Sequence, residues 1–100
     1  LIAHFRLTEA RRKAVSIPVA ARCAGWVGLR MARIVDLSAT GARIDGLEAP
    51  AGSELSLMYT DASGQRVRRQ AKVMRSAVGE SGPWLGLAFV HDAAARTAAA

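Results

Sequence analysis

Two short stretches of this sequence carry side chains that could recognise an anion. The first is a basic cluster that includes Arg11 and Arg12, and the second is the spaced set Asp36-x-Ser38-x-x-Gly41. Arginine presents a planar fork of N–H donors that matches phosphate oxygens, a carboxylate accepts from N–H groups, and a serine hydroxyl can do both. These residue types in this pattern indicate a site that binds an anionic ligand.

The charge balance also favours an anionic partner. The 100 residues carry 14 Lys and Arg against 8 Asp and Glu, which gives a formal net charge of +6. Such an excess attracts nucleotides, nucleic acids or acidic protein surfaces. The length suits one domain, and the 51% hydrophobic content is enough for a globular core. No apolar run reaches the roughly 18 residues of a transmembrane helix, so we expect no membrane insertion.

The sequence lacks the usual features of catalysis and of a metal centre. Ser38 has no histidine near it in the sequence and no Gly-x-Ser-x-Gly elbow around it. His4 and His91 lie near the two ends, and with the single Cys23 they give no metal-ligand spacing. One cysteine cannot form an intramolecular disulfide, which favours a cytoplasmic location. We therefore predict a cytoplasmic domain that is not an enzyme and holds no metal or cofactor.

Hydrophobic periodicity predicts an all-β fold. Apolar and polar residues alternate from Val15 to Cys23, as in a strand with one buried face, and Pro18 is expected to place this strand at a sheet edge. Five more strands are expected at residues 29–37, 42–45, 54–60, 65–75 and 84–90. Six short strands with turn signals roughly every 8–12 residues suggest an antiparallel barrel or sandwich.

These elements would position the candidate residues around one turn. Residues 38–41 form the predicted turn between the second and third strands, directly after Asp36. Residues 1–10 are expected to be an N-terminal arm, residues 11–91 the barrel, and residues 92–100 an alanine-rich tail in which Asp92 caps a short helix. An alternative for Asp36, Ser38 and Gly41 is a plain hairpin turn, in which Asp and Ser bond their own backbone.

The set Asp36-x-Ser38-x-x-Gly41 resembles the Asp/Asn-x-Ser-x-x-Gly motif of the PilZ family. Residues 11–19 are similar to the basic segment that leads into the first PilZ strand, and residues 84–89 resemble the closing strand of that family. The resemblance implies a six-stranded antiparallel PilZ-type β-barrel with a short C-terminal helix.

The resemblance also implies a ligand, cyclic di-GMP, which many PilZ domains bind. In those domains an Arg-x-x-x-Arg pair grips phosphates and guanine edges, and the Asp/Asn-x-Ser-x-x-Gly turn bonds the other side of the ligand. Carried to this sequence, the site would comprise Arg11, Arg12, Asp36, Ser38 and Gly41. Ligand binding would reorder the N-terminal arm, and a partner protein would read that change.

The match departs from the family at the arginine pair. Arg12 best fits the second arginine, and the first then falls on Thr8. A hydrogen bond to a charged group contributes roughly 1.5–3 kcal/mol, so the missing arginine would weaken binding about tenfold to a hundredfold. The alternative is a PilZ-like adaptor that binds no nucleotide and acts by protein–protein interaction.

A third hypothesis is a barrel that binds single-stranded nucleic acid through a basic stripe. The stripe would consist of Arg66, Arg68, Arg69, Lys72 and Arg75. Such surfaces interleave aromatic residues with the charges, and residues 65–75 contain none. Trp26 and Trp84 are interpreted as core or rim residues. Nucleic acid is therefore the least favoured partner.

Overall fold

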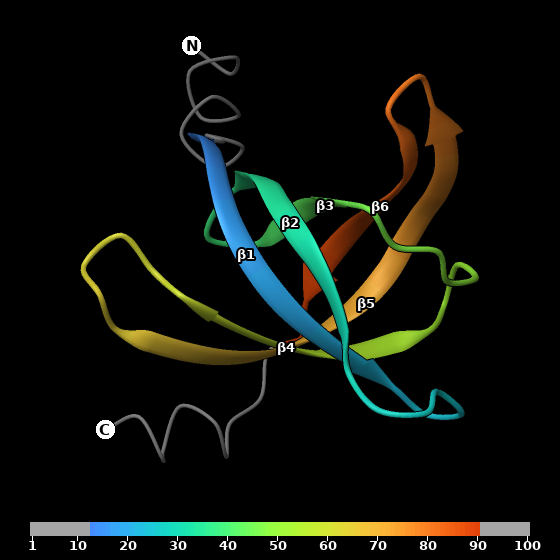
Figure 1. The fold of residues 1–100 in the computed structure, drawn as a ribbon, viewed down its shortest axis with the longest axis horizontal. Helices are drawn as coiled ribbons and strands as arrows, with labels where there is room; N and C mark the ends of the chain where they lie inside the picture. Colours follow the sequence, from blue (N-terminus) through green and yellow to red (C-terminus); the bar gives the residue numbers. More distant parts are fainter. Residues whose placement is uncertain (1–12, 91–100) are drawn as a thin grey trace, which may run out of the picture.

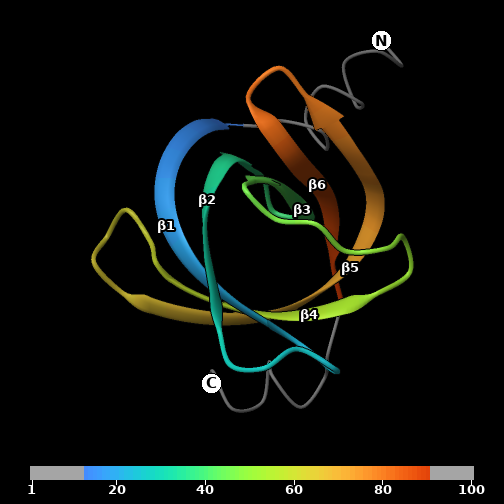
Figure 2. The same cartoon turned by 45° about the vertical axis from the view of Figure 1, so that its right-hand side comes forward.

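The structure, a computed structural model, describes residues 13–90 and consists of six strands. These are β1 (Lys13–Cys23), β2 (Arg30–Leu37), β3 (Gly41–Asp45), β4 (Glu54–Thr60), β5 (Arg66–Gly79) and β6 (Gly82–Phe89). They close into an antiparallel barrel in the order β1-β2-β3-β6-β5-β4 (Figures 1 and 2). The predicted six-stranded antiparallel barrel is confirmed. The expected arm at residues 1–10 and the short helix in the tail at 92–100 lie outside the described residues.

The interior of the barrel is apolar because alternate residues of every strand point inward. The buried strand residues are Val19, Ala21, Ile34, Ala42, Ile44, Leu55, Leu57, Tyr59, Ala71, Val73, Leu85 and Leu87. The loop between β3 and β4 adds Leu47 and Ala49 to this core. The period-two patterns expected for β1, β4 and β5 are therefore present in the structure.

The prediction that Pro18 places β1 at a sheet edge is wrong. Strand β1 pairs with β2 along one side and with β4 along the other, and the barrel is closed. The β1–β4 pairing begins at Val19, which is the residue after Pro18. The proline is accommodated because the first half of β1 has only β2 as its neighbour, so an edge exists locally within a closed sheet.

A bulge in β2 turns Asp36 to the outside of the barrel. Ile34 pairs with Ile44 and Asp36 pairs with Arg43, so Val35 is an extra residue in β2. Residues directly opposite each other in an antiparallel ladder share a face. Because Ile44 is buried, its neighbour Arg43 points outward, and so does Asp36. Simple alternation from Ile34 would have turned Asp36 inward.

A second bulge has the same effect on β5. Val73 pairs with Leu87 and Arg75 pairs with Gly86, which leaves Met74 as the extra residue. Val73 and Leu87 are buried, so Arg75 shares the outer face with Gly86. Strand β5 also extends to Gly79, past the predicted end at residue 75, because its hairpin with β6 continues beyond the barrel (Figure 1).

Residues 13–90 contain no helix long and apolar enough to cross a membrane.

Candidate functional site

Four outward-facing positions form one row across the barrel wall. Asp36 in β2 is opposite Arg43 in β3, Arg43 is opposite Gly86 in β6, and Gly86 is opposite Arg75 in β5. The row thus places a carboxylate at one end, two arginines further along, and a glycine between those arginines. Because glycine has no side chain, the row has a depression between the two guanidinium groups.

This row is part of a cavity of about 510 Å³ on the outer wall, which we call the Asp36 cavity. Its lining comprises Asp36, Thr40, Gly41, Arg43, Met74, Arg75, Trp84, Gly86, Leu87 and Ala88. The volume falls in the range of about 300–1,000 Å³ that is typical of small-molecule sites. Polar and charged groups surround an apolar floor, which is a suitable arrangement for a ligand with both charge and flat rings.

Arg43 is held in place by two neighbours on the outer face. Its guanidinium carbon lies 4.3 Å from the centroid of the Trp84 ring, and its Nε is 3.4 Å from Oδ1 of Asp45. A guanidinium over an indole is attracted by the negative face of the ring. The interaction fixes the arginine fork beside the cavity, and it assigns Trp84 to the rim, in agreement with its interpretation as a core or rim residue.

Ser38 shapes the turn between β2 and β3. Its hydroxyl oxygen accepts from the backbone N–H of Thr40 at 3.3 Å and of Gly41 at 3.2 Å. The Ser38 N–H donates to the Gly41 carbonyl at 2.9 Å. The serine therefore performs the turn-stabilising role that was the alternative to ligand binding. Ser38 does not line the cavity, whereas Asp36 and Gly41 do.

Gly41 is required by the close approach of two strands. A Cβ added at Gly41 would collide with the backbone carbonyl oxygen of Leu87 in β6. Gly41 pairs with Ala88, and the neighbouring Phe89 N–H donates to the Thr40 carbonyl at 2.8 Å. The glycine of the motif thus allows β3 to pack against β6, which forms the cavity floor.

Arg11 and Arg12 lie outside the described residues. The first described residue, Lys13, pairs with Leu37, and Ala14 pairs with Asp36. The chain therefore enters the barrel beside the Asp36–Gly41 turn and not on the far side.

Of the cavity residues that were not expected from the sequence, Arg43, Arg75, Trp84 and Gly86 matter most for its chemistry and shape. Arg43 follows Gly41 by two positions, so strand alternation placed it on the same face and was a usable signal. Arg75 was assigned to a basic stripe with Arg68, yet the bulge at Met74 shifts it to the cavity. Its position depends on the register with β6, which no local pattern reports.

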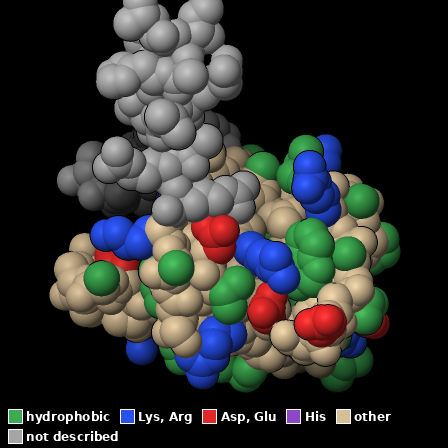
Figure 3. Space-filling view, turned by 90° about the horizontal axis from the view of Figure 1, so that it is seen from above, with side chains coloured by type: hydrophobic (Ala, Val, Ile, Leu, Met, Phe, Trp, Pro, Cys, Tyr) green, Lys and Arg blue, Asp and Glu red, His purple; other side chains and the backbone are tan. Residues whose placement is uncertain are grey.

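The basic stripe expected along β5 is divided among different surfaces. Arg66, Arg68 and Lys72 are exposed on the outer face. Arg69 lies over the Phe89 ring at 3.9 Å, and Arg75 lines the Asp36 cavity. Seen from above, basic, acidic and hydrophobic side chains are interspersed (Figure 3). Arg66, Arg68 and Lys72 remain together on one face of β5, so the stripe is shorter than the five residues that the nucleic-acid hypothesis assumed.

Within the described part of the chain, no group of three or more His, Cys, Asp or Glu side chains is arranged to hold a metal ion.

Comparisons with known proteins identify the family. The PilZ domain family model matches residues 4–99. The structure of the Bacillus subtilis inhibitor of motility (MotI/DgrA) is similar with a TM-score of 0.68 at 19% identity, covering 88% of this chain and 44% of that chain. The PilZ domain of CeSA from a cellulose-synthesizing bacterium is similar with a TM-score of 0.67 at 17% identity, covering 87% of each chain. No curated protein matches.

This chain spans less than half of the length of the inhibitor of motility. At these identities the two structures are evidence for the fold, and the family model covers nearly the whole sequence. The closed six-stranded barrel, the Asp36-x-Ser38-x-x-Gly41 turn and the family match agree, and we conclude that this chain belongs to the PilZ domain family of regulatory modules.

Proposed function

We propose that this PilZ domain binds cyclic di-GMP in the Asp36 cavity and passes the signal to a partner protein. The ligand carries two negative charges and two guanine rings. The observation that supports the proposal best is the row Asp36–Arg43–Gly86–Arg75, in which two bulges turn a carboxylate and an arginine onto one outer wall. Bulges commonly re-aim side chains next to binding sites.

The chemistry of the cavity suits a guanine dinucleotide. The Asp36 carboxylate can accept from guanine N–H groups, and the forks of Arg43 and Arg75 can donate to phosphate oxygens or to guanine O6 and N7. Gly86 adds no side chain between the two arginines, and the position is bordered by Arg75 and the Trp84 ring. In this proposal Ser38 and Gly41 hold the turn and the strand pairing that present Asp36.

The basic leader would complete the site from the N-terminal side. Because Lys13 pairs with Leu37 beside the turn, Arg12 is joined to a residue that already lies next to the motif. We assign Arg12 to the second position of the family's arginine pair, with Arg11 as a neighbouring cation. Thr8 stands at the first position of that pair, and the guanidinium groups of Arg43 and Arg75 would supply part of the positive charge that threonine does not provide.

Calorimetric titration of the full chain with cyclic di-GMP tests this proposal. We expect binding that weakens about tenfold to a hundredfold in Arg12→Ala and in Asp36→Ala, because each variant removes hydrogen bonds to a charged group. Arg22→Ala is the matched control, since it removes the same charge from an exposed position near the opposite end of β1. A dissociation constant weaker than about 100 μM in the unmodified chain, with no further weakening in Arg12→Ala, would defeat the proposal.

A second candidate function is an adaptor that recognises a protein without a nucleotide. Two observations favour it: the arginine pair is incomplete at Thr8, and Arg43 already interacts with Trp84 and Asp45. Under this alternative the residues around the Asp36 cavity maintain the fold and bind no nucleotide. Partner binding then does not depend on cyclic di-GMP. The titration above separates the two candidates.

A further inference from the structure

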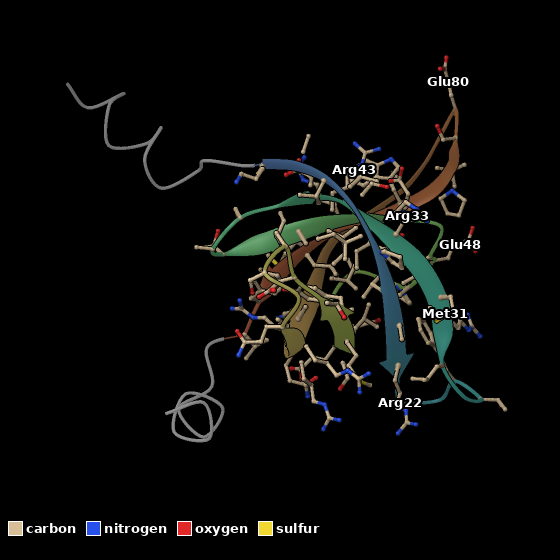
Figure 4. All side chains as sticks on the ribbon, turned by 60° about the vertical axis from the view of Figure 1, so that its left-hand side comes forward. Arg22, Met31, Arg33, Arg43, Glu48 and Glu80 are labelled. Carbon is tan, nitrogen blue, oxygen red and sulfur yellow. The ribbon has the colours of Figure 1, made fainter. Side chains whose placement is uncertain are left out.

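The wall opposite the Asp36 cavity carries a second set of recesses. In the closed strand order, the β1–β4 junction lies three strands away from the β3–β6 junction in either direction. Two recesses of about 340 and 230 Å³ occur there, and both are lined by Ala20 of β1 and Met58 of β4. We call these two recesses together the methionine groove. The separation is visible in Figure 4, where Arg22 and Met31 lie far from Arg43.

A cross-strand row explains the shape of the groove. Met31 of β2 is opposite Ala20, Ala20 is opposite Met58, and Met58 is opposite Arg68 of β5. The small Ala20 side chain between two methionines leaves a depression on either side of it. The larger recess also extends beyond Val19, where the pairing of β1 with β4 ends.

The groove combines an adaptable apolar floor with a basic rim. Met31 is 67% exposed and Leu29 is 50% exposed, and both line the groove. Methionine is flexible and polarizable, and it is often used on surfaces that bind varied apolar side chains. Covering such an exposed apolar side chain with a partner removes it from water, which favours binding.

The rim supplies charge of one sign only. Arg66 borders the larger recess, and Arg22 and Arg68 border the smaller one. Among residues 13–90, no Asp or Glu lines either recess. Three guanidinium groups around apolar pockets complement a ligand that presents carboxylates beside a bulky apolar side chain.

We propose that the methionine groove is a docking site for an acidic segment of a partner protein, which inserts an apolar side chain beside Ala20 and places its carboxylates on the arginine rim. Recessed pockets accept a protruding side chain, which a peptide provides and a bilayer surface does not. The recesses are lined by one aromatic residue, Tyr59, which is buried, so they lack the exposed aromatic platforms on which single-stranded nucleic acid stacks. The chain's own tail at residues 92–100 carries one Asp and one Arg, so it does not match the rim charge.

Selection of random linear peptides displayed on phage, against the immobilised full chain, tests this proposal. We expect the enriched peptides to combine Asp or Glu with a bulky apolar residue. The synthesised best peptide should bind Arg68→Glu about tenfold to a hundredfold more weakly than the unmodified chain. Lys72→Glu is the matched control: it makes the same charge change on the same face of β5, roughly 13 Å further along the strand.

A second variant tests the groove by shape. Ala20→Trp places a bulky ring at the residue that both recesses share, without removing a charge, and it should abolish peptide binding while thermal unfolding shows that the barrel is intact. Both groove variants should keep the cyclic di-GMP response of the unmodified chain, whatever that response is, because the two surfaces lie on opposite walls.

Three outcomes would overturn the proposal. The first is the absence of enrichment, which would also be the result if the chain's own tail covered the groove. The second is equal binding of the selected peptide to the unmodified chain, Arg68→Glu and Ala20→Trp. The third is binding to phosphatidylglycerol vesicles that Arg68→Glu abolishes, with no acidic peptide enriched, which would assign the surface to membranes.

Discussion

Asp36 lies directly opposite Arg43 in the β2–β3 ladder, and an extra residue at Val35 is the reason. The bulge reverses the face on which Asp36 would otherwise lie, so a carboxylate that alternation would bury stands beside a guanidinium on the outer wall. A matching bulge at Met74 brings Arg75 to the same wall. The candidate site therefore depends on two local irregularities of an otherwise regular barrel.

The interaction between Arg43 and Trp84 gives a spectroscopic test of ligand binding. If cyclic di-GMP enters the Asp36 cavity, it will change the surroundings of Trp84 and leave Trp26 unaffected, because Trp26 packs beneath Arg30 near the β1–β2 connection. In a Trp26→Phe variant, the fluorescence of Trp84 should change on addition of the ligand. In Trp84→Phe, the remaining fluorescence should stay constant. An equal change in both variants would mean that the ligand binds elsewhere or acts on the whole fold.

Replacing Gly41 by alanine should destabilise the barrel. The added Cβ meets a backbone carbonyl of β6, which cannot rotate away, so we expect a decrease of about 1–3 kcal/mol in the free energy of unfolding. Urea denaturation measures this decrease. Gly86→Ala is the control, because its Cβ would meet the Arg75 side chain at an ordinary 3.6 Å. It should leave stability unchanged or raise it by about 0.4–1 kcal/mol. Equal decreases in both variants would contradict the steric explanation.

Acid should weaken the β4–β5 hairpin through Asp61. The side-chain hydrogen bond from Ser63, at 2.6 Å, and the backbone bond from Gln65, at 2.9 Å, lower the pKa of Asp61 below its ordinary 3.8. A carboxyl group with a lowered pKa in the folded state contributes stability above its unfolded pKa. That contribution is lost as the pH falls from the unfolded value through the folded one.

The Asp61 prediction can be checked by NMR titration. In the unmodified chain, the Asp61 carboxyl carbon should titrate below pH 3.8. In Ser63→Ala, the pKa should move back toward that value, because the largest cause of the shift is removed. Asp61→Asn keeps an oxygen acceptor for the turn but cannot titrate, so its stability should fall less steeply in acid. A titration of Asp61 at or above pH 3.8 in the unmodified chain would refute this account.

Truncation of a core side chain should cost far more than truncation of an exposed one. Ile44 is fully buried and pairs with Ile34 across the β2–β3 ladder. Ile44→Ala should lower the free energy of unfolding by about 2–5 kcal/mol, because it removes apolar packing and leaves a cavity. Met31→Ala, at a position 67% exposed, should change it by no more than about 0.5 kcal/mol. Denaturant titration at neutral pH measures the free energy of unfolding of both variants. Similar decreases would contradict the assignment of Ile44 to the barrel core.

The strands and the location of the motif could be predicted from local sequence patterns. Alternation along Val15–Cys23 and Glu54–Thr60 reports a buried face directly, because side chains in a strand alternate between faces. The set Asp36-x-Ser38-x-x-Gly41 is visible as a string, and its place between two strands follows from the same patterns. These predictions were possible because the periodicity of a strand depends only on residues that are neighbours in the sequence.

The closure of the barrel and the composition of the candidate site depend on pairing between strands that are distant in the sequence. Pro18 suggested an edge, yet β1 pairs with β4, a strand that is distant in the chain. The row from Asp36 to Arg75 exists because bulges at Val35 and Met74 shift the alternation by one residue. A bulge is defined by the register between two strands, so it has no signature in either strand alone.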